Sequence, residues 1–94
     1  MITEEVKIIL VNCGAFYFSD QKTANNITTD LKENAKIIKK LSEINSEYRK
    51  LYNIGSDQSE YAIMEKLFNL AKSGDMPAIK EYDRRIKINK SHFK

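Results

Sequence analysis

The side chains that most often perform catalysis are scarce in this 94-residue chain. It contains one cysteine, Cys13, and one histidine, His92. One histidine near the end does not assemble a convincing serine, histidine and aspartate triad, and one cysteine allows neither a disulfide nor zinc-finger spacing. The three glycines at 14, 55 and 74 lie too far apart for a phosphate-binding loop. The sequence therefore predicts no enzyme, no metal site and no cofactor, with Cys13 a small buried hydrophobe.

Lysines at helical spacing carry the clearest chemistry in the sequence. The row consists of Lys32, Lys36, Lys39 and Lys40. If this segment is a helix, these lysines lie within an arc of roughly 100°, because each residue turns the chain by about 100°. Leu31, Ala35 and Ile38 fall outside that arc and are expected to form a buried stripe. A row of this kind either follows DNA phosphates or is an ordinary solvated face, and both interpretations are open.

The DNA-binding hypothesis adds side chains outside this row. Lys22 and Asn25, on the preceding helix, would extend a track for phosphates, while Asn34 or Lys32 would reach base edges. The candidate DNA-binding residues are Lys22, Asn25, Lys32, Asn34, Lys36, Lys39 and Lys40.

Three helices are expected to position these residues. Good capping residues predict where they begin: Thr3 for the first, Ser19 for the second and Asp30 for the third. The second helix is short, and Ala24 within it is small where two helices must approach. Helix, short turn, helix is the outline of a helix-turn-helix. The same pattern also fits a plain three-helix core, so the DNA-binding unit remains one of two interpretations.

The third helix is expected to be long. Apolar residues keep the helical period from Leu31 to Leu51, with no glycine or proline before Gly55. A helix of about 24 residues would measure roughly 36 Å. Residues 53–56 are expected to break it.

The segment 56–87 predicts a helical hairpin. Gly74 can take the left-handed conformation that ends a helix, and Asp75 can cap the next helix. Apolar residues recur at three- and four-residue spacing in both arms, so a wide apolar stripe must be covered. A chain this short builds only a small core, and self-association is therefore expected. The candidate oligomerisation residues are Tyr61, Met64, Leu67, Phe68, Ile79 and Tyr82.

The predicted fold is all-α, with an N-terminal three-helix helix-turn-helix unit that has a long third helix, followed by a helical hairpin. The expected bounds are 1–55 for the first unit, 56–87 for the hairpin and 88–94 for a flexible basic tail, in which His92 is an ordinary residue. Composition agrees with a helical globular protein, at 41% hydrophobic and 31% charged residues with a net charge of +3. No stretch resembles a signal peptide or a membrane span, so an intracellular protein is expected.

Two segments together resemble the small subunit of a bacteriophage terminase. They are residues 12–27, NCGAFYFSDQKTANNI, and residues 48–85, YRKLYNIGSDQSEYAIMEKLFNLAKSGDMPAIKEYDRR. In that family a helix-turn-helix is followed by helices that oligomerise. The resemblance implies a non-catalytic subunit in the cytoplasm of the bacterial host that recognises viral DNA for packaging. Its implied partners are double-stranded DNA, further copies of the chain and the terminase large subunit, which carries the ATPase and nuclease; no membrane is involved.

Two other functions fit the same sequence. One is a small helical protein-interaction module of phage or mobile-element origin that binds a host protein and never touches DNA. The other is a compact helix-turn-helix transcriptional regulator, usually a dimer on a two-fold site. Salt-dependent DNA binding separates DNA-binding functions from the interaction module, and the number of subunits helps to separate a packaging assembly from a dimeric regulator.

Overall fold

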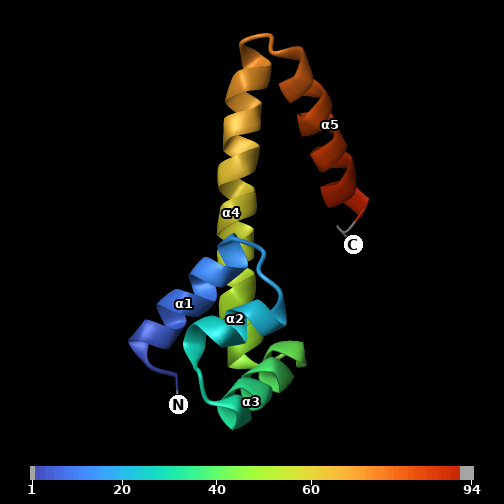
Figure 1. Ribbon diagram of the computed structural model, residues 1–94. Helices are drawn as coiled ribbons and strands as arrows, with labels where there is room; N and C mark the ends of the chain where they lie inside the picture. Colours follow the sequence, from blue (N-terminus) through green and yellow to red (C-terminus); the bar gives the residue numbers. More distant parts are fainter. Residues whose placement is uncertain (1, 92–94) are drawn as a thin grey trace. The chain divides into compact units, whose positions relative to one another are not determined.

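In the computed structural model of this protein, residues 2–91 are described and they form five α-helices without a strand (Figure 1). The helices are α1 (Glu4–Ala15), α2 (Asp20–Ile27), α3 (Leu31–Ser42), α4 (Glu47–Lys72) and α5 (Met76–Ser91). The prediction of an all-α fold is confirmed. The chain divides into two compact units, Met1–Ser59 and Glu60–Lys94, and α4 contributes residues to both.

Side-chain caps begin the first three helices, as the sequence predicted. Thr3 caps α1, Ser19 caps α2 and Asp30 caps α3, and each side-chain oxygen accepts the backbone N–H three residues later, at 3.2, 3.1 and 2.9 Å. Each cap satisfies one of the N–H groups that a helix leaves unpaired in its first turn. The starts of α1, α2 and α3 are therefore determined by residues that are close in the sequence.

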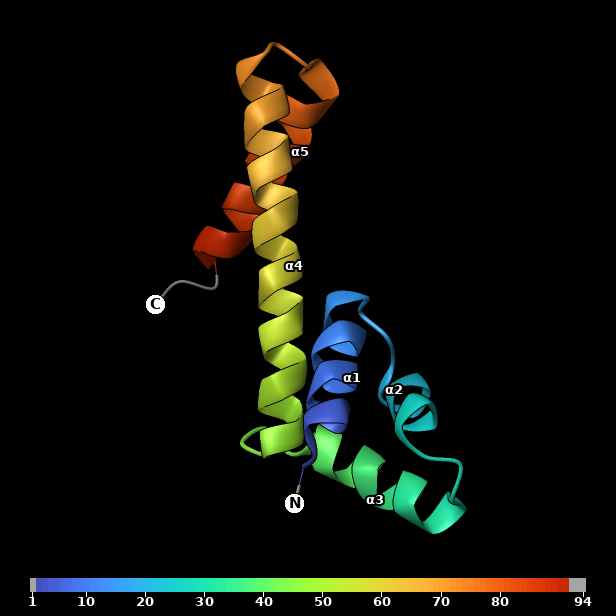
Figure 2. The same ribbon diagram turned by 90° about the vertical axis from the view of Figure 1, so that its left-hand side faces the viewer.

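The core of the first unit is made by α1, α2 and α3, which gather at the N-terminal part of α4 (Figure 2). Half-buried residues of α4, including Tyr48, Leu51 and Tyr52, pack against it. The buried apolar residues of this core are Leu10, Ala24, Ile37 and Leu41.

The expected long third helix is wrong, because α3 ends at Ser42 and a new helix begins at Glu47. At this break, serine hydroxyls donate hydrogen bonds to carbonyls in the last turn of α3. The Ser42 hydroxyl donates to the Lys39 carbonyl at 2.6 Å, and the Ser46 hydroxyl donates to the Lys40 carbonyl while accepting the Arg49 N–H at 3.0 Å. Serine hydroxyls compete in this way with continued helix hydrogen bonds, which a hydrophobic period does not reveal.

Arg49 joins three helices of the first unit. Its Nε donates to the Leu41 carbonyl near the end of α3 at 2.6 Å, and its Nη2 lies 2.7 Å from the Asp20 carboxylate at the start of α2. The guanidinium also lies 4.6 Å from the centre of the Tyr52 ring. The planar fork of arginine donates in two directions at once, so a single side chain of α4 fixes an end of α2 and an end of α3.

The predicted break at residues 53–56 is also wrong, since α4 continues through them. Gly55 is buried there, against the backbone of α1. A Cβ on Gly55 would lie 1.8 Å from the Val11 carbonyl oxygen, and a Cβ on Gly14 would lie 1.9 Å from the Tyr52 carbonyl oxygen. Both glycines therefore serve a close crossing of α1 and α4, with Gly55 inside α4 and Gly14 one residue before the end of α1.

The hairpin prediction is confirmed at its turn. Gly74 has φ of 93°, and the Gly74 and Asp75 N–H groups donate to the Ala71 and Leu70 carbonyls at 3.0 and 3.2 Å. This pair of hydrogen bonds is the Schellman arrangement that closes a helix on a left-handed glycine. Asp75 then caps α5 through the Ala78 N–H at 2.9 Å.

The second arm of the hairpin is longer than expected. Residues 88–91 were assigned to a flexible tail, but α5 extends to Ser91. No glycine or proline interrupts this stretch, and Lys90 in the last turn complements the negative end of the helix dipole. The rest of the predicted tail, residues 92–94 with His92, lies outside the described residues.

Candidate nucleic-acid interface

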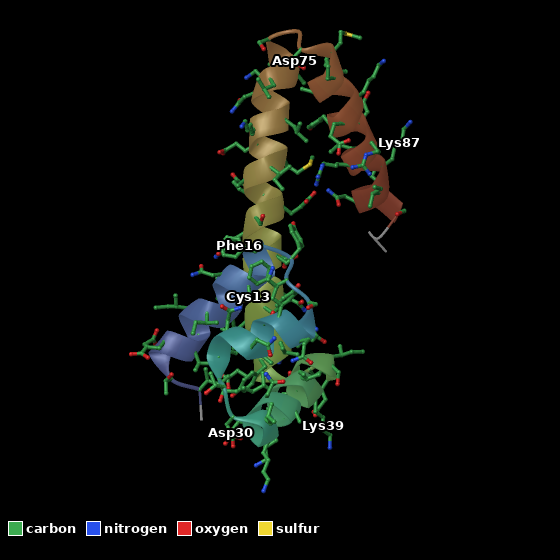
Figure 3. The ribbon with its side chains drawn as sticks, viewed as in Figure 1. Cys13, Phe16, Asp30, Lys39, Asp75 and Lys87 are labelled. Carbon is green, nitrogen blue, oxygen red and sulfur yellow. The ribbon has the colours of Figure 1, made fainter. Side chains whose placement is uncertain are left out.

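The lysine row lies on the solvent side of α3. All four lysines are exposed. Lys32, Lys36 and Lys39 lie away from Ile37 and Leu41, whose burial holds α3 in the core, whereas Lys40 lies beside Ile37 around the helix. Figure 3 shows the Lys39 side chain extending away from the helix. The α3 segment contains these four lysines and one acidic residue, Glu33, so this helix face has an excess of positive charge.

The lysine ammonium ions interact only weakly with neighbouring groups. Lys36 Nζ lies 3.8 Å from the Glu33 carboxylate, an exposed pair of the kind that contributes little to stability. Lys40 Nζ lies 5.1 Å from the centre of the Tyr48 ring. Among the described residues, no carboxylate pairs with Lys32 or Lys39 within 4.0 Å. The row is therefore available to an anionic partner.

The buried side of α3 differs from the predicted stripe. Leu31 is 86% exposed, Ala35 is exposed and Ile38 is half-buried, whereas Ile37 and Leu41 are buried. The sequence allows two overlapping apolar stripes, and packing against the rest of the core selects the one through Ile37 and Leu41. Leu31 and Ala35 of the expected stripe therefore lie on the surface, as does Ile44 beyond the end of α3.

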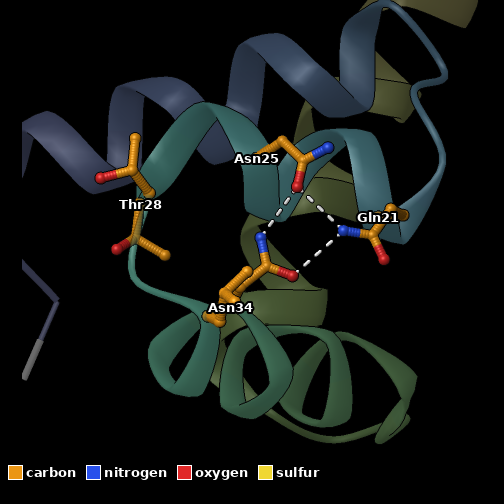
Figure 4. A pocket seen from close by; sticks show the side chains of 6 residues that line it. Gln21, Asn25, Thr28 and Asn34 are labelled. Atoms are coloured by element: carbon orange, nitrogen blue, oxygen red, sulfur yellow. Dashed lines mark hydrogen bonds between the residues drawn. The ribbon is translucent and has the colours of Figure 1, made fainter.

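A cluster of three amides joins α2 to α3 (Figure 4). Gln21 Nε2 donates to Asn25 Oδ1 at 2.8 Å and to Asn34 Oδ1 at 3.0 Å, and Asn34 Nδ2 donates to Asn25 Oδ1 at 2.9 Å. With Thr28, Thr29 and Leu31 these residues line an open hollow of about 300 Å³. Two predicted contact residues, Asn25 and Asn34, are thus brought together and oriented by each other. Sequence analysis missed Gln21, although its spacing of four residues from Asn25 on one helix face was a signal.

Lys22 takes a different environment from the other candidates. It is exposed on α2, and its Nζ lies 4.3 Å from the centre of the Phe18 ring. An exposed cation over an aromatic face gains roughly 0.5–1 kcal/mol, so this contact holds the side chain loosely.

The hairpin presents an incompletely covered apolar surface. Ala78 is the only buried residue among those described in the second unit. Tyr61 is 71% exposed and Phe68 is 46% exposed, with the Phe68 and Tyr82 rings 5.8 Å apart. The groove of about 290 Å³ at this surface is lined by Tyr61, Met64, Glu65, Phe68 and Tyr82. Leu67 and Ile79, the other two predicted oligomerisation residues, are half-buried and do not line this groove.

Ion pairs tie the two arms of the hairpin together. Arg85 Nη1 lies 2.7 Å from the Glu60 carboxylate on α4, and Arg85 Nε lies 3.2 Å from Glu81. Arg84 also holds Glu81, with Nε donating at 2.8 Å. The hydrogen bond from Arg84, together with Arg85, lowers the pKa of the Glu81 carboxyl to about 2. These arginines are therefore engaged within the hairpin.

Other kinds of site are not found in the described residues. Within residues 2–91, no three His, Cys, Asp or Glu side chains lie close enough together to hold a metal ion. Nor does that range contain a helix with the length and apolar character that crossing a membrane requires. Cys13 is buried as predicted, and its burial raises the pKa of the thiol. Comparison of the chain with protein-family models, curated proteins and solved structures found no match.

Proposed function

We propose that this protein is a non-catalytic DNA-binding subunit, in which α2 and α3 act as a helix-turn-helix and the hairpin joins copies of the chain. The observation that carries the proposal is the row of four exposed lysines on α3, of which Lys32, Lys36 and Lys39 face away from the residues that anchor this helix in the core. A helix held from one side and charged on the other can enter the major groove while its lysines contact phosphates.

The α2–α3 geometry supports this mode of docking. A turn of three residues, 28–30, separates the helices, and the fully buried Ala24 lets them approach. The amide cluster of Gln21, Asn25 and Asn34 then keeps α3 at one orientation relative to α2. Because DNA presents phosphates at fixed spacing, a recognition helix held rigidly loses less entropy on binding.

The hairpin supports the proposed assembly. An isolated pair of helices with one buried residue leaves much of its apolar surface in water, and a second copy would cover it. A DNA-binding unit followed by a hairpin that assembles is the organisation that the resemblance to a phage terminase small subunit implies. Within this proposal the assembled subunits mark viral DNA and present it to the large ATPase and nuclease subunit.

The test of DNA binding is charge reversal on α3. In the variant, Lys32, Lys36 and Lys39 are replaced by Glu, and binding to labelled duplex DNA of random sequence is followed by fluorescence anisotropy over a range of salt concentrations. Each phosphate contact contributes about 0.9 to the magnitude of the slope of log K against log salt, so three lysine contacts account for roughly 2.7 of the slope of the unmodified protein. We expect the variant to lose DNA binding while its circular dichroism spectrum stays helical.

A second triple variant controls for net charge alone. It carries the same change at three exposed lysines of α4 and α5, namely Lys50, Lys66 and Lys80. We expect this control to retain most of the affinity and most of the salt slope. Equal loss in the two variants would show that net charge, and not the α3 row, governs binding. No salt-dependent binding by the unmodified protein would refute the proposal.

A protein-interaction module is the second candidate, and the exposed aromatic residues Tyr61 and Phe68 favour it. Such a module would bind a host protein through the hairpin groove and would not bind DNA. Light scattering on the free protein separates the candidates further. A salt-sensitive DNA complex formed by a species larger than a dimer supports the packaging subunit, a dimer supports a transcriptional regulator, and a monomer without DNA affinity supports the interaction module.

A further inference from the structure

The first turn of α3 exposes two apolar side chains among its charges. Leu31, the first residue of the helix, is 86% exposed, and Ala35 one turn later is also exposed. Residues four apart lie on one side of a helix, so these two make a small continuous apolar strip. Neither residue belongs to the buried core that positions α3. Both side chains are therefore available to contact a partner.

The surroundings of the strip favour a partner that carries phosphates. Lys32 and Lys36 each follow one residue after a member of the strip, about 100° further around the helix, and Lys39 lies close to the same side. An uncharged partner that covers the strip would have to desolvate these ammonium ions without pairing them, whereas a phosphate backbone pairs with them. Charge complementarity thus favours a surface with phosphates beside an apolar group.

The major groove offers one apolar group on its base edges, the 5-methyl group of thymine. We propose that Leu31, together with Ala35, contacts thymine methyl groups and is the specificity-determining part of α3. This inference rests on the proposed DNA-binding function. The lysines cannot supply such discrimination through phosphates, which are the same for every base pair. The amides of Asn25 and Asn34 are hydrogen bonded to each other and to Gln21. In this proposal their role is to hold α3 in place.

The size of the effect follows from the burial of one methyl group. Removing a methyl-sized group from water contributes about 0.8 kcal/mol, which is roughly fourfold in affinity. Leu31 should therefore give roughly a fourfold preference for thymine over uracil at each methyl group it covers. Uracil pairs with adenine as thymine does and lacks only that methyl group, so the comparison isolates the contact.

The experiment uses two short duplexes of alternating sequence, one of adenine and thymine and one of adenine and deoxyuridine. Affinities of the full chain for both are measured by fluorescence anisotropy at one low salt concentration. Leu31→Ala removes the proposed contact and keeps a good helix former at the first position of α3. Ile44→Ala is the matched control, because Ile44 is 84% exposed and lies between α3 and α4 instead of on α3.

We expect the unmodified protein and the Ile44→Ala variant to bind the thymine duplex at least fourfold more tightly, and Leu31→Ala, which keeps only the smaller contact of Ala35, to lose most of that preference. Binding without any preference by the unmodified protein, or an unchanged preference in Leu31→Ala, would overturn this inference and leave the DNA-binding proposal standing. Absence of binding to either duplex would instead refute the proposed function, and with it the inference.

Discussion

Replacing Gly55 by Ala should destabilise the first unit, although Ala is the better helix former. In the close crossing of α1 and α4, the new Cβ would lie 1.8 Å from the Val11 carbonyl oxygen, 2.7 Å from its carbonyl carbon and 3.0 Å from the Ala15 nitrogen. To restore a separation of 3.0 Å, the oxygen would have to withdraw by about 1.2 Å. These are backbone atoms of a helix, so no side-chain rotation can relieve the overlap.

Two opposing contributions set the magnitude. Alanine in a helix interior is more favourable than glycine by about 1 kcal/mol. Overpacking costs roughly 1–3 kcal/mol, and the upper end applies here because the obstructing atoms belong to rigid backbone. We therefore expect a net loss of about 2 kcal/mol in the free energy of unfolding. For a domain of this size that corresponds to a fall of roughly 8–16 °C in the melting temperature.

The assay is thermal and urea unfolding followed by circular dichroism for the unmodified protein and Gly55→Ala. Asn53→Ala is the control, because Asn53 is an exposed residue of the same helix and gains helix propensity without a new contact. The control should be equally stable or slightly more stable. Gly14→Ala should reproduce the loss from the other side, since its Cβ would lie 1.9 Å from the Tyr52 carbonyl oxygen.

The sign of the effect tests the close crossing. If α1 lay further from a continuous α4, Gly55→Ala would be neutral or stabilising, because only the helix propensity would change. A variant as stable as the unmodified protein would refute the close crossing of α1 and α4.

Three further predictions concern the other contacts. Arg49→Lys should cost roughly 1.5–3 kcal/mol in urea unfolding, because lysine cannot donate to the Leu41 carbonyl and the Asp20 carboxylate in the same fork; equal stability would show that the fork is dispensable. The pKa of Glu81 is lowered from 4.5 to about 2 in the folded hairpin, so its stabilising contribution is complete above about pH 4.5 and is lost as pH falls through 2. The advantage in melting temperature over Glu81→Gln should disappear across that range, and an advantage independent of pH would contradict the ion pair. Phe68→Asp should reduce the molar mass measured by light scattering, whereas Asn69→Asp, an exposed neighbour on α4, should not; an unchanged mass in Phe68→Asp would show that assembly does not use the groove.

The candidate site was predictable to different degrees. Lys32, Lys36, Lys39 and Lys40 share an exposed face because their spacing follows the helical period, which depends on backbone geometry alone. The cluster around Gln21 was not foreseen, because its hydrogen bonds cross between two helices and depend on how closely these pack. The exposure of Leu31 was mispredicted for a related reason. When a helix has apolar residues on more than one face, its sequence alone does not show which face the neighbouring helices will bury.

The sequence by itself determined where α1, α2, α3 and α5 begin, although not α4, and how the hairpin turns. Thr3, Ser19, Asp30 and Asp75 cap helices through N–H groups only three residues away, and Gly74 needs only its own backbone freedom to take a positive φ. These interactions are local and are complete within one turn of chain.

Tertiary structure alone decided which glycines end helices and where the long helix runs. Gly55 carries the same local signal as Gly74, yet it lies inside α4 because it faces the backbone of α1, a helix distant in the sequence. Gly14 lies one residue before the end of α1 and faces the backbone of α4 without a positive φ. At the break after Ser42, Arg49 of α4 likewise makes a contact that a hydrophobic period does not reveal, because its side chain reaches back to the Leu41 carbonyl of α3. The physical reason is that local rules describe what a residue permits, whereas contact between helices selects which permitted conformation is used.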